Sequence, residues 1–212
     1  MLEQTPTLTP IVNGRFELPP AEVASRNGTA APLSTPEFSL ETKIKRLQGP
    51  ILVLGGSGFV GANLLRTILR YRPDAYGTTT RLPAWRLEDL PADNVKLVDL
   101  LIDSNLDNLL DEVRPRTIFN CIAYGGYSFE TDSQLIYQTN FNFISRLLPR
   151  LEKRGIACYV HAGSSSEYGD NASGPKENEL TAPNSDYAVS KVACANLLVH
   201  SLLLSLSDKR DV

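Results

Sequence analysis

Ile51-Leu52-Val53-Leu54-Gly55-Gly56-Ser57-Gly58-Phe59-Val60-Gly61 is the stretch that decides the fold. Its first four residues form an apolar run of the kind found in strands that are buried on both faces of a parallel sheet. Glycines then recur with the GxGxxG spacing, and apolar residues at helical spacing follow. A strand, a glycine turn and a helix in this order predict a site where backbone N–H groups hold a dinucleotide pyrophosphate. A tight turn without a ligand is the less favoured interpretation.

Strand-like and helix-like segments alternate along the rest of the chain. Further strands are expected at 75–79, 95–98, 117–122 and 156–160, and helices at 59–71, 106–113, 134–154 and 185–207. Because alternating strands and helices build parallel sheets, the pattern predicts an α/β fold with a doubly wound parallel sheet.

The first 45 residues have a different composition. They hold six of the 14 prolines, many Thr, Ser and Ala residues, and no sustained apolar periodicity. Such a segment buries too little apolar surface to offset the entropy of ordering it. We therefore expect an arm or linker at 1–45 and a dinucleotide-binding domain at 46–212. An arm that packs on the domain or on a partner, through Ile11, Val12 and Phe16, is the alternative.

The overall composition argues against several kinds of partner. With 42% hydrophobic residues, 21% charged residues and a net charge of −3, the chain gives no reason to expect nucleic acid or a membrane surface. No apolar run is long enough to span a bilayer, and the first residues do not resemble a signal peptide. Cys121, Cys158 and Cys194 lie in apolar segments, which predicts buried thiols in a reducing compartment, the cytoplasm. We expect no metal site.

The residues after the second strand bear on the choice of cofactor. An acidic side chain there would bind the adenosine ribose and favour NAD. The sequence instead has Thr78-Thr79-Thr80-Arg81, whose hydroxyls and guanidinium suit a 2′-phosphate. The cofactor is therefore expected to be NAD(P), with NADP favoured. The alternative is that Arg81 points to solvent.

Tyr187 and Lys191 are four residues apart and would share one face of the last helix. A cation held beside a phenol makes the phenol a stronger acid, so the pair predicts a tyrosine that transfers a proton. A Tyr-x-x-x-Lys pair alone is usually a surface pair, but this one follows a glycine turn and five expected strands. Ser164 and Ser165 follow the fifth strand, at the sheet edge where ligands bind. An ordinary Ser/Gly loop is the alternative there.

The glycine turn, the serine turn before Tyr168-Gly169 and Tyr187-Ala188-Val189-Ser190-Lys191, in this order, resemble the extended short-chain dehydrogenase/reductase family. Within that family the NAD(P)-dependent nucleotide-sugar epimerases and dehydratases are most similar. The resemblance covers about residues 50 to 206. It implies a Rossmann-type fold and an enzyme that acts on a nucleotide-linked sugar through hydride transfer and a keto intermediate. The alternative is a non-catalytic NAD(P)-binding sensor or an inactive fragment, although a sensor needs only the glycine turn.

The resemblance also implies residue roles. Tyr187 would be the general base or acid, and Lys191 would assist it and hold the nicotinamide ribose. The serine that binds the reacting oxygen is Ser164 when counted back from Tyr168, and Ser165 if one residue is deleted. Glu167 would be an additional acid or base, or an anchor of the turn. Cofactor contacts are expected from Gly55, Gly58, Phe59, Val60, Gly61, Thr80, Arg81, Asp99, Leu100, Ala123, Asn140, Tyr187 and Lys191.

The sequence departs from the family in its length. Members continue beyond the Tyr/Lys helix with a sixth strand and a substrate-binding domain, whereas this chain ends at Val212. We therefore expect a fragment that is truncated before the domain that selects the sugar. An exposed sheet edge would invite a partner, which leaves a homodimer open.

Overall fold

The computed structural model describes residues 39–171 and 173–207, with side chains up to residue 201. All of them belong to one compact unit, Thr35–Val212. The proposed contact residues Ile11, Val12 and Phe16 of the arm lie outside the described residues. The boundary between arm and domain therefore stays a prediction.

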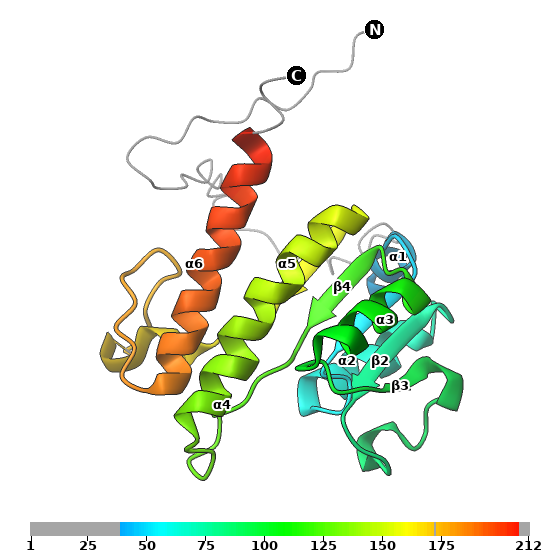
Figure 1. Cartoon of the computed structure of the whole chain (residues 1–212), viewed down its shortest axis with the longest axis horizontal. Helices are drawn as coiled ribbons and strands as arrows, with labels where there is room; N and C mark the ends of the chain where they lie inside the picture. The colour runs from blue at the N-terminus through cyan, green and yellow to red at the C-terminus, as the bar shows by residue number, and fades with distance from the viewer. Residues whose placement is uncertain (1–38, 172, 208–212) are drawn as a thin grey trace, which may run out of the picture. The chain divides into compact units, whose positions relative to one another are not determined.

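A five-stranded parallel sheet forms the centre of the described part (Figure 1). Its strands are β1 (Ile51–Leu54), β2 (Ala75–Thr79), β3 (Val95–Leu97), β4 (Thr117–Asn120) and β5 (Cys158–His161), in the order β3-β2-β1-β4-β5. The α-helices are α1 (Leu40–Lys45), α2 (Phe59–Leu69), α3 (Asp103–Val113), α4 (Ser133–Tyr137), α5 (Phe143–Arg154) and α6 (Asp186–Ser207). The shorter helical turns are η2 (Trp85–Leu87), η3 (Ala92–Asn94), η4 (Gln138–Asn142) and η5 (Ser165–Asn171). This confirms the expected doubly wound α/β fold.

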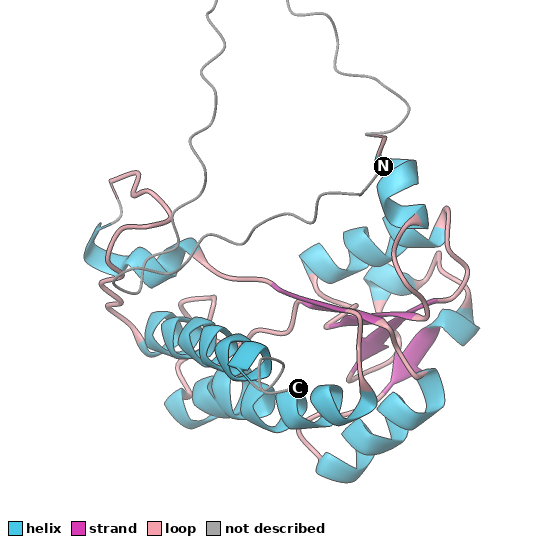
Figure 2. Cartoon of the chain, turned by 90° about the horizontal axis from the view of Figure 1, so that it is seen from above, coloured by secondary structure: helices cyan, strands magenta, loops and turns pink. Residues whose placement is uncertain are grey.

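Helices cover both faces of the sheet (Figure 2). The alternate residues of β1 show why. Leu52 and Leu54 belong to a core shared with α3, α5 and α6, whereas Ile51 and Val53 belong to a core shared with α1 and α2. Since successive side chains of a strand point to opposite faces, a strand between two helical layers needs an unbroken apolar run. All four residues of β1 are fully buried.

The structure contains a short helix that the sequence analysis did not predict. Ser39 caps α1 by accepting a hydrogen bond from the backbone N–H of Thr42, and Ile44 is buried in the core beside α2. The last six residues of the expected arm are therefore helical and pack on the domain. The sequence signal was weak because α1 has only six residues and a single buried side chain.

The long expected helix at 134–154 has a change of winding inside it. α4 passes through the π-helical turn η4 into α5, and Asn140 is the buried residue of that turn. π-helical turns inserted into α-helices occur frequently at functional sites. Here the inserted turn directs Asn140 towards the loop after β4.

The edge strand β5 corrects one expectation. Cys194 is buried and Cys121 half-buried, but Cys158 is exposed, so the prediction of three buried thiols is wrong for Cys158. Cys158 and Val160 lie on one face of β5, and no described helix covers them there. Tyr159, on the opposite face, packs against the core beneath α5 and α6.

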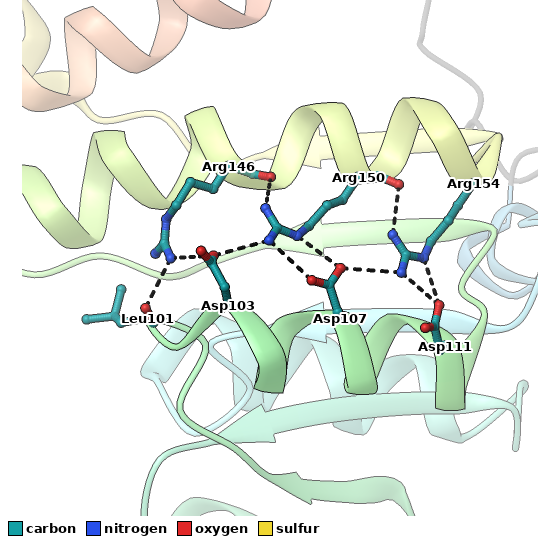
Figure 3. A network of polar contacts seen from close by, with 7 residues as sticks. All are labelled: Leu101, Asp103, Asp107, Asp111, Arg146, Arg150 and Arg154. Carbon is teal, nitrogen blue, oxygen red and sulfur yellow. Dashed lines mark hydrogen bonds and ion pairs between the residues drawn. The ribbon is translucent and has the colours of Figure 1, made fainter.

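A ladder of ion pairs joins α3 to α5 (Figure 3). Arginines 146, 150 and 154 recur every fourth residue on α5, and aspartates 103, 107 and 111 recur every fourth residue on α3. The closest nitrogen–oxygen distances are 2.7 Å for Arg146–Asp103, 3.0 Å for Arg150–Asp107 and 2.7 Å for Arg154–Asp111. The equal spacing of one helical turn on both helices keeps the charges in register.

Candidate functional site

The glycine turn between β1 and α2 is closed by short contacts. Gly55 has a φ of 74°, in the left-handed region that favours glycine. Its backbone N–H donates to Thr78 Oγ1 at 3.0 Å, and its carbonyl accepts from the Gly58 N–H at 3.0 Å. A Cβ at Gly61 would lie 2.2 Å from the Gly55 carbonyl oxygen, so α2 can start this close to the strand only with glycine at that position.

The first turn of α2 has backbone donors available. Gly58 is its N-cap and carries no side chain that could accept from them. The first N–H groups of a helix have no partner within the helix, and they bind anions such as phosphate. The cap is therefore consistent with a site for a pyrophosphate.

A pocket of about 420 Å³ opens at the carboxyl ends of the strands. Six of the residues expected to bind cofactor line it: Gly55, Gly58, Thr80, Asp99, Leu100 and Ala123. Its walls come from the loops after β1, β2, β3 and β4 and from the helical segment at 135–143. A side chain at Gly55 would meet the backbone of Cys121, so the loops after β1 and β4 touch where the two strands end. Ligands of doubly wound sheets bind at this point, where the strand order reverses.

The other expected cofactor residues do not line this pocket. Phe59 and Val60 are exposed in the first turn of α2, and Gly61 is buried beneath the glycine turn. Arg81 is exposed beyond β2. Its backbone is tied to the Thr79 hydroxyl, while its guanidinium pairs with no carboxylate of the described residues.

Asn140 binds protein groups on every side. Its Oδ1 accepts from the Tyr124 N–H at 2.9 Å, and its Nδ2 donates to the Tyr124 carbonyl at 2.8 Å and to Ser190 Oγ at 2.9 Å. The Ser190 hydroxyl in turn donates to the Tyr187 carbonyl at 2.7 Å. Asn140 thus fixes the loop after β4 against the helix that carries Tyr187.

Tyr187 and Lys191 lie in the first turns of α6, as expected. Tyr187 is half-buried, and a side chain at Gly126 would come within 3.8 Å of its ring. Its hydroxyl makes no hydrogen bond to any residue described. Lys191 is only 2% exposed, and its nitrogen donates to the Ala162 carbonyl at 2.6 Å. Burial lowers the pKa of Lys191, and the ionised forms of Cys194, Glu167 and Cys121 would oppose this shift.

The serine turn after β5 has a defined arrangement. The Ser164 N–H donates to Glu167 Oε1 at 2.8 Å, and the Ser164 hydroxyl accepts from the Ser166 N–H at 3.2 Å. Glu167 therefore anchors the turn. Ser164 is half-buried and Ser165 is exposed, so both hydroxyls remain candidates for the substrate contact.

Sequence reasoning missed a group of polar residues beside Lys191. Asn120, Tyr159, His161 and Cys194 come from β4, β5 and α6, and they contact one another or Lys191. The pKa of His161 is lowered to about 4, mainly by burial and to a smaller extent by Lys191 in its charged form. The sequence feature that could have pointed to this group is His161, the last residue of β5, which stands directly before the serine turn.

Two kinds of feature are absent from residues 39–171 and 173–207. No helix there is long and apolar enough to cross a membrane. No group of three or more His, Cys, Asp or Glu side chains in the same residues could hold a metal ion.

The strand order and the glycine turn at the point where it reverses define a dinucleotide-binding domain of the Rossmann type. The chain belongs to the NAD dependent epimerase/dehydratase family, whose family model matches residues 51–201. The resemblance found in the sequence is thereby confirmed.

Several solved structures share this fold. UDP-glucose 4-epimerase of Thermus thermophilus, in complex with NAD, is 25% identical with a TM-score of 0.64, over 70% of this chain and 49% of that chain. WbmG of Bordetella bronchiseptica, in complex with NAD and UDP, is 21% identical with a TM-score of 0.61, over 71% and 49%. L-threonine 3-dehydrogenase of Trypanosoma brucei is 20% identical with a TM-score of 0.64, over 71% and 48%. The chain spans about half the length of each.

Proposed function

We propose that this chain forms the cofactor-binding and acid–base part of an NAD(P)-dependent epimerase or dehydratase that acts on a nucleotide-linked sugar. One observation carries the proposal: the loop after β4 joins the pocket to the tyrosine. Cys121 to Tyr124 line the pocket, and Gly126, two residues further on, lies against the ring of Tyr187. A ligand that fills the pocket along this loop would end beside the phenol.

The residues of the pocket fit a dinucleotide in three ways. The glycine turn lets α2 begin close to β1, since a Cβ at Gly61 would meet the Gly55 carbonyl oxygen, and the N-terminus of α2 has free backbone donors. Thr80, Asp99 and Leu100 lie at the ends of β2 and β3, where the adenosine half of a dinucleotide would bind. A bound nicotinamide would accept and return a hydride, which converts a sugar alcohol to a ketone and back.

The chain's own groups would then move the proton. Tyr187 would take the proton from the sugar hydroxyl and return it. Its phenol hydroxyl is available for this because it makes no hydrogen bond to any described residue. Lys191 would stabilise the phenolate as an ammonium and bind the nicotinamide ribose. Ser164 or Ser165 would donate a hydrogen bond to the reacting oxygen. We place Glu167 as an anchor because it binds the Ser164 N–H.

NADP is the proposed form of the cofactor. Arg81 is exposed at the end of β2, and none of the described carboxylates pairs with its guanidinium. A 2′-phosphate on the adenosine ribose would supply that partner. The three cysteines are free thiols, which supports our proposal of a cytoplasmic protein. The edge of β5 is unpaired and one of its faces is exposed within the described residues. Both features support binding of a protein partner there, which includes a second copy of this chain.

The experiment has a binding stage and a turnover stage. NADPH and NADH fluorescence titrations of the 212-residue chain measure cofactor binding. A longer protein in which a substrate-binding domain follows the chain is then assayed with UDP-sugars and, as a different class of substrate, with L-threonine. Tyr187→Phe is compared with Tyr127→Phe, which removes an exposed hydroxyl from the loop after β4.

We expect binding of both cofactors, turnover of a UDP-sugar, and a loss of at least about 100-fold in kcat for Tyr187→Phe only. Binding with activity that Tyr187→Phe leaves unchanged would reject the acid–base assignment. Binding without turnover of any substrate by the longer protein would favour the non-catalytic sensor. Turnover of L-threonine alone would reject the sugar-nucleotide assignment.

A further inference from the structure

Lys191 is buried without a carboxylate partner. It is 2% exposed, and no described carboxylate oxygen lies within ion-pair distance of its nitrogen. The nitrogen has two close neighbours: the Ala162 carbonyl oxygen at 2.6 Å and His161 Nε2 at 3.2 Å. A buried ammonium without a counter-charge is costly in free energy, so these two neighbours decide its charge state.

Asn120 determines which nitrogen of the His161 ring carries the proton. The Ile122 N–H donates to Asn120 Oδ1 at 3.1 Å, which fixes the orientation of the amide. Asn120 Nδ2 then faces His161 Nδ1 at 3.2 Å and the Tyr159 hydroxyl at 3.1 Å. An amide nitrogen only donates, so Nδ1 must accept. A neutral imidazole in this position carries its proton on Nε2.

The Nε2–H group points to Lys191 and Cys194. It lies 3.2 Å from the lysine nitrogen and 3.5 Å from Cys194 Sγ. An ammonium has three donors and no acceptor, so it would oppose the Nε2–H group. A neutral amine, in contrast, can donate to the Ala162 carbonyl and accept from Nε2–H. Only the neutral amine makes both contacts favourable.

We propose that His161 is a positioning residue for Lys191: held as the Nε2–H tautomer by Asn120, it donates to the lysine nitrogen and keeps Lys191 a neutral amine in the cofactor-free protein. The role of Lys191 towards a cofactor rests on the proposed function. The charge state of Lys191 in the cofactor-free chain does not depend on the proposed function.

Four titratable groups of the described residues lie around Lys191. They are His161 on β5, Cys194 on α6, Cys121 after β4 and Glu167 in η5. Burial raises the pKa of the Cys121 thiol, and it raises that of Cys194 to about 11, so both are neutral near pH 7. Burial lowers the pKa of His161 to about 4, so the ring is uncharged near pH 7. Glu167 favours the ammonium, but burial outweighs its effect on the pKa of Lys191.

A cofactor would change this state. Its pyrophosphate carries negative charge, and its ribose hydroxyls can accept from an ammonium. Binding would therefore be coupled to uptake of a proton by Lys191. The ammonium formed in this way is the form that stabilises a phenolate at Tyr187.

The first test is 15N NMR of the imidazole groups in the cofactor-free chain. The sequence has two histidines, and His200→Gln leaves the signals of His161 alone. We expect a neutral Nε2–H tautomer from pH 8 to pH 5. Asn120→Asp replaces the donor with an acceptor, so we expect the proton to move to Nδ1 or the ring to become charged. An Nδ1–H tautomer or a charged ring in the otherwise native chain at pH 7 would overturn the proposal.

The second test follows the lysine side chains by 13C NMR of their Cε atoms, with Lys191→Met to assign the signal of Lys191. We expect it to titrate below pH 7, at least about three units below the ordinary lysine value of about 10.4, and titration above pH 8 would overturn the proposal. His161→Gln offers a carbonyl oxygen to an ammonium and should shift the titration of Lys191 upwards, whereas His161→Leu, which keeps the site apolar and offers no acceptor, should leave the titration low. Titration of Lys191 together with the other lysines contradicts a neutral amine.

The third test is calorimetry of NADPH binding at pH 8 in buffers of different ionisation enthalpy. We expect proton uptake in the unsubstituted chain and a smaller uptake in His161→Gln. Binding without proton uptake would overturn the proposed coupling. If no dinucleotide binds, the proposed function fails, and the two NMR tests still decide the state of Lys191.

Discussion

Asn140 Nδ2 donates a hydrogen bond to Ser190 Oγ at 2.9 Å, and this bond joins the π-helical turn η4 to α6. Ser190 extends this hydrogen-bonded chain to Tyr187, because its hydroxyl donates to the Tyr187 carbonyl. The other two hydrogen bonds of Asn140 hold the backbone of Tyr124, in the wall of the pocket. One buried side chain therefore fixes the distance between the proposed cofactor site and the proposed acid–base residue.

Asn140→Ala should destabilise the protein and separate the two parts of the site. Burying unpaired groups at Tyr124 and Ser190 should lower the free energy of unfolding by about 3 kcal/mol. Urea unfolding followed by circular dichroism measures the loss. Asn142→Ala is the matched control, because Asn142 lies in the same turn but is exposed; its effect should be within about 0.5 kcal/mol. Equal effects of the two substitutions would contradict the bridging role.

The framework of the fold could be predicted from the sequence. The strand expected at 51–54 is observed as β1 with the same bounds, and the strand at 75–79 as β2. Their apolar and β-branched residues form short local patterns, and the glycines mark where β1 stops. The expected strand at 117–122 ends two residues early, at Asn120. Cys121 and Ile122 instead enter the pocket wall, where the chain must leave the sheet.

The connections within the site could not be predicted. The partners of Asn140 lie 16 and 50 residues away in sequence, and His161 meets Lys191 across 30 residues. No local periodicity encodes contacts over such separations. The resemblance supplied Asn140 as a cofactor contact, whereas its hydrogen bonds are to Tyr124 and Ser190. His161 followed the apolar run of a strand and offered no motif.

Gly61→Ala should damage the glycine turn more than Gly58→Ala. A Cβ at Gly61 would lie 2.2 Å from the Gly55 carbonyl oxygen, whereas one at Gly58 would lie 3.3 Å from the same atom. Relief of the first clash requires α2 to move, which we expect to cost about 1–3 kcal/mol of unfolding free energy. The displaced turn should also lower NADPH affinity at least about 10-fold. Thermal unfolding and fluorescence titration check both effects, and an unaffected Gly61→Ala variant would contradict the packing described.

Arg81→Ala should distinguish NADPH from NADH. If the guanidinium binds a 2′-phosphate, its loss removes a charge-assisted hydrogen bond and should lower NADPH affinity about 10-fold. NADH affinity should not change, because NADH lacks that phosphate. Arg70→Ala, at the exposed C-cap of α2, controls for the loss of one positive charge. Equal affinities of the unsubstituted chain for NADH and NADPH would contradict the assignment, as would a preference for NADH.

Asp107→Asn tests the ion-pair ladder between α3 and α5. The Asp107 carboxylate lies 3.0 Å from Arg150 Nε and 3.4 Å from Arg154 Nη2. Both arginines keep other partners, since Arg150 also pairs with Asp103 and Arg154 with Asp111. The substitution should therefore destabilise the protein less than Asn140→Ala. Because exposed ion pairs are screened by salt, the difference from the unsubstituted chain should shrink as NaCl is raised from about 0.05 M to about 1 M.

The pH dependence of the same variant has a definite sign. The hydrogen bond from Arg150 lowers the pKa of Asp107 in the folded chain, and the charge of Arg150 adds to the shift. The contribution of Asp107 to the free energy of unfolding is therefore complete above the unfolded pKa of about 3.9, and it is lost as the pH falls below that value and through the lower pKa of the folded chain. The stability difference between Asp107→Asn and the unsubstituted chain should be constant from pH 7 to pH 5 and should narrow below pH 4.

The control for the salt experiment is Asp93→Asn, which removes an equal charge from an exposed residue that forms no ion pair within the described residues. A salt effect of the same size for Asp93→Asn would show that net charge, and not the ladder, sets the difference.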